Sequence, residues 1–344
     1  MTDIMKNQVN DTKPVAVIIL NWNGAHLLRE YLPSVVKHTP QEIAEVIVAD
    51  NGSTDDSLKV LAEEFPMVKV MAFDTNYGFA EGYNKALLAT SNKYTVLLNS
   101  DVAVKDDWLT PLYRFMETHE EYAGCQPKIR SYLRPEMFEY AGAAGGFIDC
   151  NGYPFCRGRI FAEVEHDRGQ YDGDPIDIDW ATGACLMVCT ELYNRVGGLD
   201  KHFFAHMEEI DLCWRLRAEG YRLAAVTDAA VYHLGGGSLP AENPRKTYLN
   251  FRNSLLMLHK NLPQKRRGFM LIKRRLLDTL AWCMFMAKGD LANAKAILKA
   301  HHDFRTMRDN LYTRPSGTLD LPSAPNLLTG YYLRGRRTYS AITR

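Results

Sequence analysis

The chain has no excess of charge of either sign. Its 344 residues include 41 Lys and Arg and 41 Asp and Glu, so the formal net charge is zero. This balance argues against a nucleic-acid partner, because nucleic-acid-binding domains present a basic surface. The sequence also lacks an apolar run near the ~20 residues that a membrane-spanning helix needs. The longest candidate, residues 276–287, is shorter and contains Asp278.

Several common signatures are missing as well. The seven cysteines are odd in number and form no Cys-x-x-Cys pair, which argues against a zinc site or a disulfide framework. We expect them to be small buried residues in a reducing compartment. Residues 1–13 are polar, without the apolar segment of a signal peptide, and predict a flexible N-terminus and a cytoplasmic protein. No Gly-x-Gly-x-x-Gly or Gly-Lys-Ser/Thr motif indicates a dinucleotide cofactor or a P-loop.

Apolar strand patterns alternate with helical ones in the first hundred residues. Strands are predicted at 14–20, 45–50, 68–73 and 94–98, with helical patterns between them. This alternation is typical of an α/β fold with a mostly parallel sheet and helices on both faces. Residues 125–180 are rich in Gly, Asp and Pro and predict loops and antiparallel strands at one edge of the sheet. The pattern is helical from residue 243 and irregular after residue 313.

Polar residues follow the predicted strands at the points where they end. They are Asn21 and Asn23, Asp50, Asn76 with Gly78, and Asn99-Ser100-Asp101. The carboxyl ends of parallel strands share one edge, where ligands of α/β sheets bind, so these residues should converge. A carboxylate there can hold a hard cation against a phosphate, although Asn-Ser-Asp is also an ordinary turn composition. The set suits a nucleotide diphosphate held through a metal.

Two later clusters contain groups that can move protons or bind ions. Glu208, Glu209 and Asp211 begin a predicted helix, where acids either stabilise the helix dipole or supply a general base. His233 ends an extended segment and precedes three glycines, Gly235 to Gly237. It is either a structural histidine or a metal or phosphate ligand, and the glycines predict a loop that closes over a substrate.

Eight segments in this order resemble the inverting glycosyltransferases of family 2, in particular the rhamnosyltransferase-type branch. The segments are VIILNWNG at 17–24, VADNGSTD at 48–55, NYGFAEGYN at 76–84, LLNSD at 97–101, WATGA at 180–184, VGGLD at 196–200, EEIDLCWR at 208–215 and HLGGGS at 233–238. The resemblance implies the GT-A nucleotide-sugar-binding fold over residues 14–242, with a nucleotide-sugar half at 14–124 and an acceptor half at 125–242. Residues 243–344 would add a C-terminal helical region and tail.

The resemblance also implies a role for each candidate residue. We call the edge where the strands have their carboxyl ends the rim. Asp50 would contact the nucleotide base there, and the other rim residues would bind the nucleotide sugar: Asn21, Asn23, Asn76, Gly78, Asn99 and Ser100. Asp101 and His233 would bind Mg²⁺ or Mn²⁺. Glu209 stands where the family usually has an aspartate base, which leaves Glu208 and Asp211 as alternatives. Asn99 replaces the first acid of the family's Asp-x-Asp motif.

The implied reaction is a non-processive, metal-dependent transfer with inversion. The donor would be dTDP-L-rhamnose, with UDP-linked hexoses or N-acetylhexosamines next, and the acceptor a cell-surface glycan or a polyprenyl-linked precursor. A processive synthase is not expected, because the chain has no Gln-x-x-Arg-Trp motif. The alternative is a catalytically inactive nucleotide-sugar-binding protein of the same fold. A sugar nucleotidyltransferase would need a basic Gly-rich loop after the first strand, which residues 21–24 do not supply.

Six basic residues lie beside apolar ones between positions 265 and 287: Lys265, Arg266, Arg267, Lys273, Arg274 and Arg275. This composition predicts peripheral contact with the anionic inner face of the cytoplasmic membrane. The alternatives are an amphipathic helix packed on the catalytic domain or on a second subunit of a homodimer.

Overall fold

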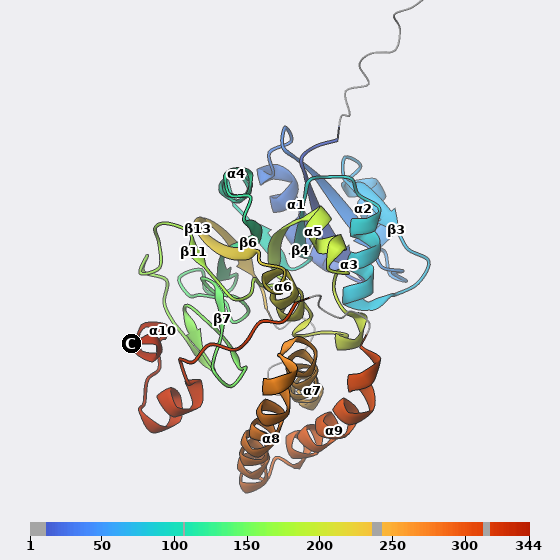
Figure 1. The fold of residues 1–344 in the computed structure, drawn as a ribbon. Helices are drawn as coiled ribbons and strands as arrows, with labels where there is room; N and C mark the ends of the chain where they lie inside the picture. The colour runs from blue at the N-terminus through green and yellow to red at the C-terminus, as the bar shows by residue number, and fades with distance from the viewer. Residues whose placement is uncertain (1–11, 106, 236–242, 312–316) are drawn as a thin grey trace, which may run out of the picture.

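The computed structural model describes residues 12–105, 107–235, 243–311 and 317–344 (Figure 1). Most of the N-terminus predicted to be flexible, and Gly236 to Ser238 of the predicted closing loop, lie outside the described residues. Within the described part, no helix combines the length and the apolar character needed to cross a bilayer.

The four strands predicted from the first hundred residues form the parallel half of the main sheet. They are β1 (Val15–Asn21), β2 (Ala44–Asp50), β3 (Lys69–Ala72) and β4 (Tyr94–Asn99). β1 lies between β2 and β4, and β3 is at the edge. The register pairs Asn21 with Asp50 and Leu20 with Asn99, so the polar strand ends share one edge of the sheet. The α/β fold with a mostly parallel sheet is thereby confirmed.

The other half of the sheet is mixed. Its strands are β5 (Val102–Val104), β6 (Tyr122–Ser131), β11 (Ile176–Asp177), β12 (Cys185–Cys189) and β13 (Arg222–His233). β12 is antiparallel to both β4 and β6, while β13 is parallel to β6. β13 also pairs with the short β5, which puts His233 opposite Val102 and beside Asp101.

One sequence expectation for this half was wrong. Residues from 125 were expected to form edge structure, but β6 is a ten-residue strand in the interior of the sheet. Its Gly124 and Pro127 hide the strand pattern, and Gly124 is needed because a Cβ there would lie 2.6 Å from the carbonyl oxygen of Met187. The extended segment that ends at His233 is β13, and its pairing with β6 shifts register between Val226 and Ala230.

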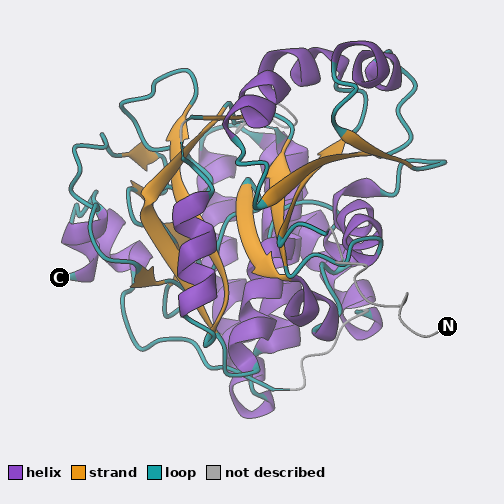
Figure 2. Cartoon of the chain, turned by 90° about the horizontal axis from the view of Figure 1, so that it is seen from above, coloured by secondary structure: helices purple, strands orange, loops and turns teal. Residues whose placement is uncertain are grey.

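Helices cover both faces of this sheet, as Figure 2 shows. They are α1 (Ala25–His38), α2 (Ser57–Glu64), α3 (Gly78–Leu88), α4 (Thr110–Thr118), α5 (Thr190–Arg195) and α6 (Glu208–Ala218), with a 3-10 turn η1 (Lys201–Phe203) before α6. Leu28 of α1 and Leu112 of α4 pack in one apolar core, whereas Tyr83 of α3 and Leu212 of α6 pack in the other. The sheet is therefore buried on both sides, which explains its nearly continuous apolar runs.

The C-terminal region begins with three helices that lie below the sheet in Figure 1: α7 (Pro244–Asn261), α8 (Gln264–Ala287) and α9 (Leu291–Met307). The short η2 (Arg308–Asn310) and η3 (Thr329–Leu333) follow, and α10 (Tyr339–Thr343) is close to the end of the chain. Leu255 and Phe304 share a core with the sheet, and the division at residue 242 stays a prediction. The tail after residue 313 is less irregular than expected.

A second, antiparallel sheet anchors that tail. Its strands are β7 (Gly146–Ile148), β8 (Pro154–Cys156), β9 (Arg159–Ile160) and β10 (Glu163–Val164). Leu327 and Ile342 pack against Phe155 in a small separate core. All seven cysteines are free, and four are buried as expected, but Cys283 is exposed because the face of α8 that carries it is not covered.

Candidate active site

The ends of β1 and β2 are held together by a buried amide and carboxylate. Asn21 Nδ2 donates to Asp50 Oδ2 at 3.0 Å, and the Ser53 amide donates to Asp50 Oδ1 at 2.9 Å. The Ser53 hydroxyl in turn accepts from the Asn23 amide at 2.9 Å. Asn21 and Asp50 are fully buried, whereas Asn23 is half-buried. The first two thus shape the rim from below, and Asn23 lies at its surface.

A second amide, Asn51, joins this rim to the loop before α3. Its Nδ2 donates to Asn76 Oδ1 and to the Gly78 carbonyl, both at 3.0 Å, and its Oδ1 accepts from the Tyr77 amide. Asn51 lies within a motif quoted above, but no role was predicted for it. A Cβ added at Gly78 would meet no atom within 4 Å, so this side of the rim is open.

The residues predicted to hold a metal meet at the ends of β4 and β13. His233 Nε2 lies 3.1 Å from Asp101 Oδ1 and 3.4 Å from the side-chain nitrogen of Asn99. On the opposite side of the ring, Nδ1 lies 3.3 Å from Glu139 Oε2. Burial lowers the pKa of His233, but hydrogen bonds and charge from Asp101 and Glu139 outweigh it and raise the pKa to about 10. Sequence reasoning missed Glu139, because it lies in a segment without a recognisable motif.

This corner has the donor set of a partial site for a hard cation. A carboxylate oxygen faces an imidazole nitrogen that can ligate a cation once it has lost its proton, and a second carboxylate lies against the other ring nitrogen, an arrangement common behind metal-ligating histidines. Within the described part of the chain, no group of three or more His, Cys, Asp or Glu is arranged to hold an ion without further ligands. The residues therefore fit a Mg²⁺ or Mn²⁺ that takes its remaining ligands from a bound diphosphate.

The two glutamates at the start of α6 are unusual carboxyl groups. Oε2 of Glu208 and Oε2 of Glu209 are both buried without a hydrogen-bond partner. Burial, reinforced by Glu209 and Asp211, raises the pKa of Glu208 well above its usual value. Burial raises the pKa of Glu209 to about 7, although backbone amides at the helix start act in the opposite direction. A carboxyl with this pKa is suited to accept a proton near neutral pH.

Glu209 faces residues 183–184, which lead to the Asp101 corner, the place where Asp101 meets His233. Its Cβ lies 3.8 Å from the position that a Cβ would take at Gly183, and the Phe79 ring lies 3.6 Å from that position. The next residue, Ala184, accepts a hydrogen bond from the Asn99 amide at 3.1 Å. Two segments that are far apart in the sequence, at 99–101 and 208–209, are thus linked through 183–184.

Asp211, the third candidate base, is instead part of a buried ionic network. Its Oδ2 accepts from Arg215 Nε at 2.9 Å and from Lys260 Nζ at 2.8 Å, and its Oδ1 accepts from Asn261 at 2.8 Å. Lys260 also contacts Asp200 at 2.8 Å. This bonding fixes α6 on α7 and leaves the Asp211 carboxylate little freedom to reach a substrate.

Comparison with known proteins relates the N-terminal part of the chain to one family. Residues 16–150 match the model of the family described as "Glycosyl transferase family 2". The curated relatives include the N-acetylglucosaminyl-diphospho-decaprenol L-rhamnosyltransferase of Mycobacterium tuberculosis, which is 25% identical over 65% of this chain and 76% of its own length. The rhamnosyltransferase WbbL of Escherichia coli is 24% identical over 61% and 79%. Residues 16–150 match glycosyltransferase family 2, and the chain as a whole is similar to glycosyltransferases.

Solved structures agree on the fold of this glycosyltransferase. GalNAc-T7, solved with UDP, GalNAc and Mn²⁺, has a TM-score of 0.57 and 18% identity over 74% of this chain and 49% of its own. Residues 1–349 of TarS from S. aureus give a TM-score of 0.53 and 18% identity over 84% and 79%. The expected GT-A fold is confirmed.

A strained loop leads into α6 of the glycosyltransferase. Phe204, His206 and Met207 have backbone φ angles of 67°, 69° and 73°, in the left-handed region that non-glycine residues rarely adopt. Asn253 of α7 holds this loop, because its side-chain amide donates to the carbonyls of Phe203, Ala205 and His206 at 2.9, 2.9 and 2.7 Å. Such backbone strain persists only where the surroundings fix it. Sequence reasoning missed Asn253, since it stands in an ordinary helical pattern.

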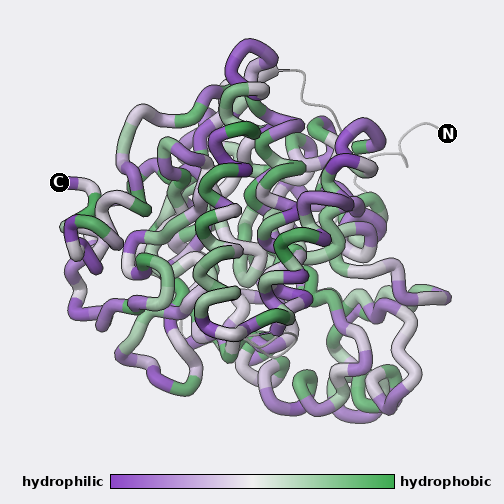
Figure 3. The backbone as a smooth tube through the Cα atoms, turned by 90° about the horizontal axis from the view of Figure 1, so that it is seen from below, coloured by the Kyte–Doolittle hydropathy of each residue, from purple (hydrophilic) through white to green (hydrophobic). Residues whose placement is uncertain are grey.

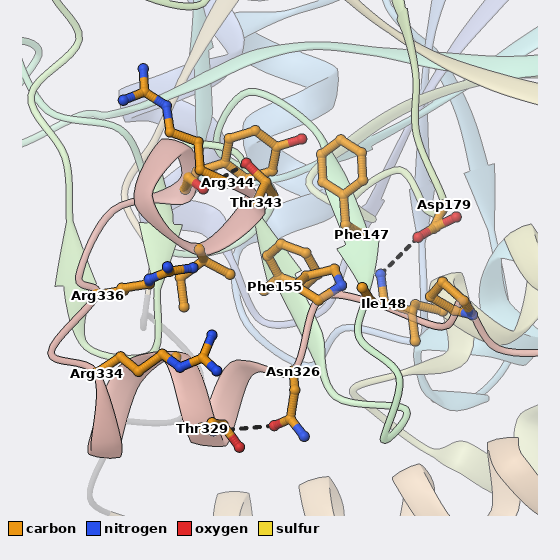
Figure 4. A pocket seen from close by; sticks show the side chains of 16 residues that line it. Phe147, Ile148, Phe155, Asp179, Asn326, Thr329, Arg334, Arg336, Thr343 and Arg344 are labelled. Carbon is orange, nitrogen blue, oxygen red and sulfur yellow. Dashed lines mark hydrogen bonds between the residues drawn. The ribbon is translucent and has the colours of Figure 1, made fainter.

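A recess of the surface lies away from these residues. Its volume is about 670 Å³, and it separates β7 and β8 from the C-terminal segment. Figure 4 shows Phe147 and Phe155 on one side of it and Arg334 and Arg336 on the other. None of the predicted site residues lines this recess.

Proposed function

We propose that this glycosyltransferase moves a sugar from a nucleotide diphosphate to a hydroxyl of a cell-surface glycan or polyprenyl-linked precursor, with inversion and without processive synthesis. The observation that carries the proposal is the position of Glu209, a carboxyl with a pKa raised to about 7, beside the segment that leads to the Asp101 corner. A base and a site for the diphosphate are the two parts that a single displacement needs.

Each step falls to a residue already described. The Glu209 carboxylate accepts the proton of the acceptor hydroxyl, whose oxygen attacks the anomeric carbon as the bond to the diphosphate breaks. Attack from the face opposite the leaving group inverts that carbon, through an oxocarbenium-like transition state. Asp101 and His233 would hold the divalent cation, whose charge stabilises the leaving diphosphate. Glu139 orients the His233 ring for this task.

For donor binding we propose two groups of residues, one exposed enough to touch the donor and one buried beneath it. Asn23, Asn76, Gly78, Asn99 and Ser100 are at least partly exposed and would contact the nucleotide sugar. Asn21 and Asp50 are fully buried, so they would act mainly by fixing the loops that make these contacts. Contact of Asp50 with the base would need a small opening of the rim.

The relatives' names support one donor and acceptor class. Two of them are named rhamnosyltransferases, and one name specifies a diphospho-decaprenol acceptor. We therefore put dTDP-L-rhamnose first among donors and a polyprenyl-linked glycan first among acceptors, with the protein on the inner face of the cytoplasmic membrane. Mn²⁺ in the titles of two structural neighbours supports the proposed cation.

A panel of nucleotide sugars tests the donor directly. Selective binding should raise the melting temperature, and the rise should increase with Mn²⁺ or Mg²⁺. The selected donor is then incubated with a water-soluble acceptor analogue. Product would support the enzyme over an inactive sugar-nucleotide-binding protein, whereas binding without product from any acceptor would favour the latter.

A further inference from the structure

The outward side of α8 is apolar. Phe269, Ile272, Leu276 and Leu280 follow one another at three- and four-residue spacing, and each is between 62% and 68% exposed. This spacing puts them on one face of the helix. Met284 and Met286 add 47% and 41% exposed side chains toward its C-terminal end. We call the set of these six residues the α8 apolar face.

The inward side of α8 is largely ionic, the reverse of an ordinary surface helix. Of its three buried residues, Met270, Arg274 and Asp278, two are charged. Arg274 donates to Ser254 Oγ at 2.8 Å and lies 3.9 Å from the centre of the Tyr153 ring. Asp278 contacts Arg274 at 3.6 Å and His301 of α9 at 3.0 Å. These pairs fix the rotation of α8, so the α8 apolar face is held outward.

The charges that remain on the surface of α8 are all positive. Asp278 is the sole acid of the helix and is buried, whereas Lys265 and Arg275 are exposed and Lys273 is half-buried. Arg274, which was predicted among the basic residues of the membrane contact, is buried instead. Long basic side chains beside an apolar face can reach lipid headgroups while that face enters the acyl boundary.

We propose that α8 docks on an anionic lipid surface, with the α8 apolar face in the membrane interface and Lys265, Lys273 and Arg275 on the headgroups. Figure 3 views the end of the molecule that carries α7 to α9, where apolar and polar turns alternate along the helices. This proposal rests on the proposed function in one respect, which is that a polyprenyl-linked acceptor would reside in the same membrane.

A second copy of the chain is a poorer occupant. A two-fold interface would bring the α8 apolar face against itself. It would then gather the basic residues of both copies without an exposed acid on α8 to pair with them. An anionic bilayer supplies the opposite charge along the whole helix and attracts each basic residue near its surface.

Vesicle sedimentation tests the surface without requiring activity. We expect the full chain to bind vesicles of phosphatidylcholine with phosphatidylglycerol, and to bind pure phosphatidylcholine vesicles at least about tenfold more weakly. Leu276→Glu combined with Leu280→Glu should abolish binding. Leu88→Glu, at an exposed leucine of α3, is the matched control and should bind as the wild type does. Replacing Lys265, Lys273 and Arg275 with Gln should remove the preference for the anionic lipid.

The results with the double leucine variant distinguish a membrane from a second copy as the partner of the α8 apolar face. Unchanged vesicle binding by the double leucine variant would overturn the proposal. A wild-type dimer in sedimentation velocity that the same variant converts to monomer, with no vesicle binding, would assign the face to a second copy. Transfer to a water-soluble acceptor should be equal in wild type and variant, so loss of activity in both would concern the proposed function and not this surface.

Discussion

At the scale of single residues, the start of α6 separates two neighbouring carboxyl groups. Glu208 and Glu209 are both raised in pKa by burial, but only Glu209 faces the 183–184 segment. The pKa of Glu209, about 7, makes it partly ionised at neutral pH, and burial with charge from Glu209 and Asp211 raises the pKa of Glu208 well above its usual value. Because Glu209 lies beside Gly183, we propose it as the base among the three candidates.

The pH dependence of turnover follows from this pKa. A base works only when deprotonated, so kcat of the wild type should rise as pH increases and reach half of its plateau near pH 7. The folded state binds this proton more tightly than the unfolded chain, so the same group lowers stability as pH rises from the usual glutamate pKa toward 7. Glu209→Gln should remove that part of the stability loss in urea unfolding at several pH values. A flat kcat profile between pH 5 and pH 8 would contradict the assignment.

Metal dependence is the second property that depends on single residues. Removing divalent cations with EDTA should stop transfer, and Mn²⁺ or Mg²⁺ should restore it. Asp101→Ala should lower transfer by at least about a hundredfold and abolish the restoration, because it removes the only carboxylate that faces His233 Nε2 among the described residues. Asn99→Ala should mainly raise the KM for the donor. Full activity of Asp101→Ala would remove this residue from the site.

At the scale of elements, α7 connects the C-terminal region to the catalytic residues. Asn253 holds the strained 203–207 loop, and Lys260 and Asn261 bind Asp211 one turn into α6. Positive φ angles at three non-glycine residues favour release of the loop unless these contacts oppose it. The position of Glu209 therefore depends on a helix outside the sheet.

Asn253→Ala measures this dependence. Loss of bonds to three carbonyls should lower the free energy of unfolding by about 2–4 kcal/mol and reduce kcat more than donor affinity. Asn250→Ala, in the same helix and without these bonds, should change stability by less than about 0.5 kcal/mol. Chemical denaturation and donor titration provide both readouts. Equal effects of the two variants would mean that Asn253 does not hold the loop.

Two adjacent arginines of α8 offer a matched pair. Arg274→Met should lower the free energy of unfolding by about 3 kcal/mol, because it leaves Asp278 buried with less compensation. Arg275 is exposed, so Arg275→Met should stay within about 0.5 kcal/mol of the wild type. Thermal and urea unfolding compare them. Similar losses would show that the inward charges of α8 do not fix its rotation.

The sequence predicted the parallel half of the sheet and the meeting of its polar ends, since apolar runs and parallel register determine both. It did not predict β6, because Gly124 and Pro127 break the strand pattern although tertiary packing requires the glycine. Glu139 and Asn253 were also missed. Their side chains act through contacts with residues about 90 and 50 positions away, which no local pattern encodes.

At the scale of the whole molecule, the glycosyltransferase combines the central sheet with a C-terminal helical region. This region contacts the loop before Glu209 and also carries an exposed apolar face. α7 supports the base from one side, and α8 presents an apolar, basic surface to the exterior. In the arrangement we propose, a polyprenyl-linked acceptor would approach from the membrane that α8 contacts, while the nucleotide sugar would enter from water.

Product formation by Glu209→Gln is the most direct test of the mechanism. With the donor selected in the binding panel, Glu209→Gln should lower kcat by about 10²–10⁴-fold while leaving donor affinity unchanged. Glu208→Gln should retain far more activity, because Glu209, which lies beside Gly183, is left in place as the base. Wild-type turnover by Glu209→Gln, or a loss confined to Glu208→Gln, would contradict the assignment of Glu209 as the base.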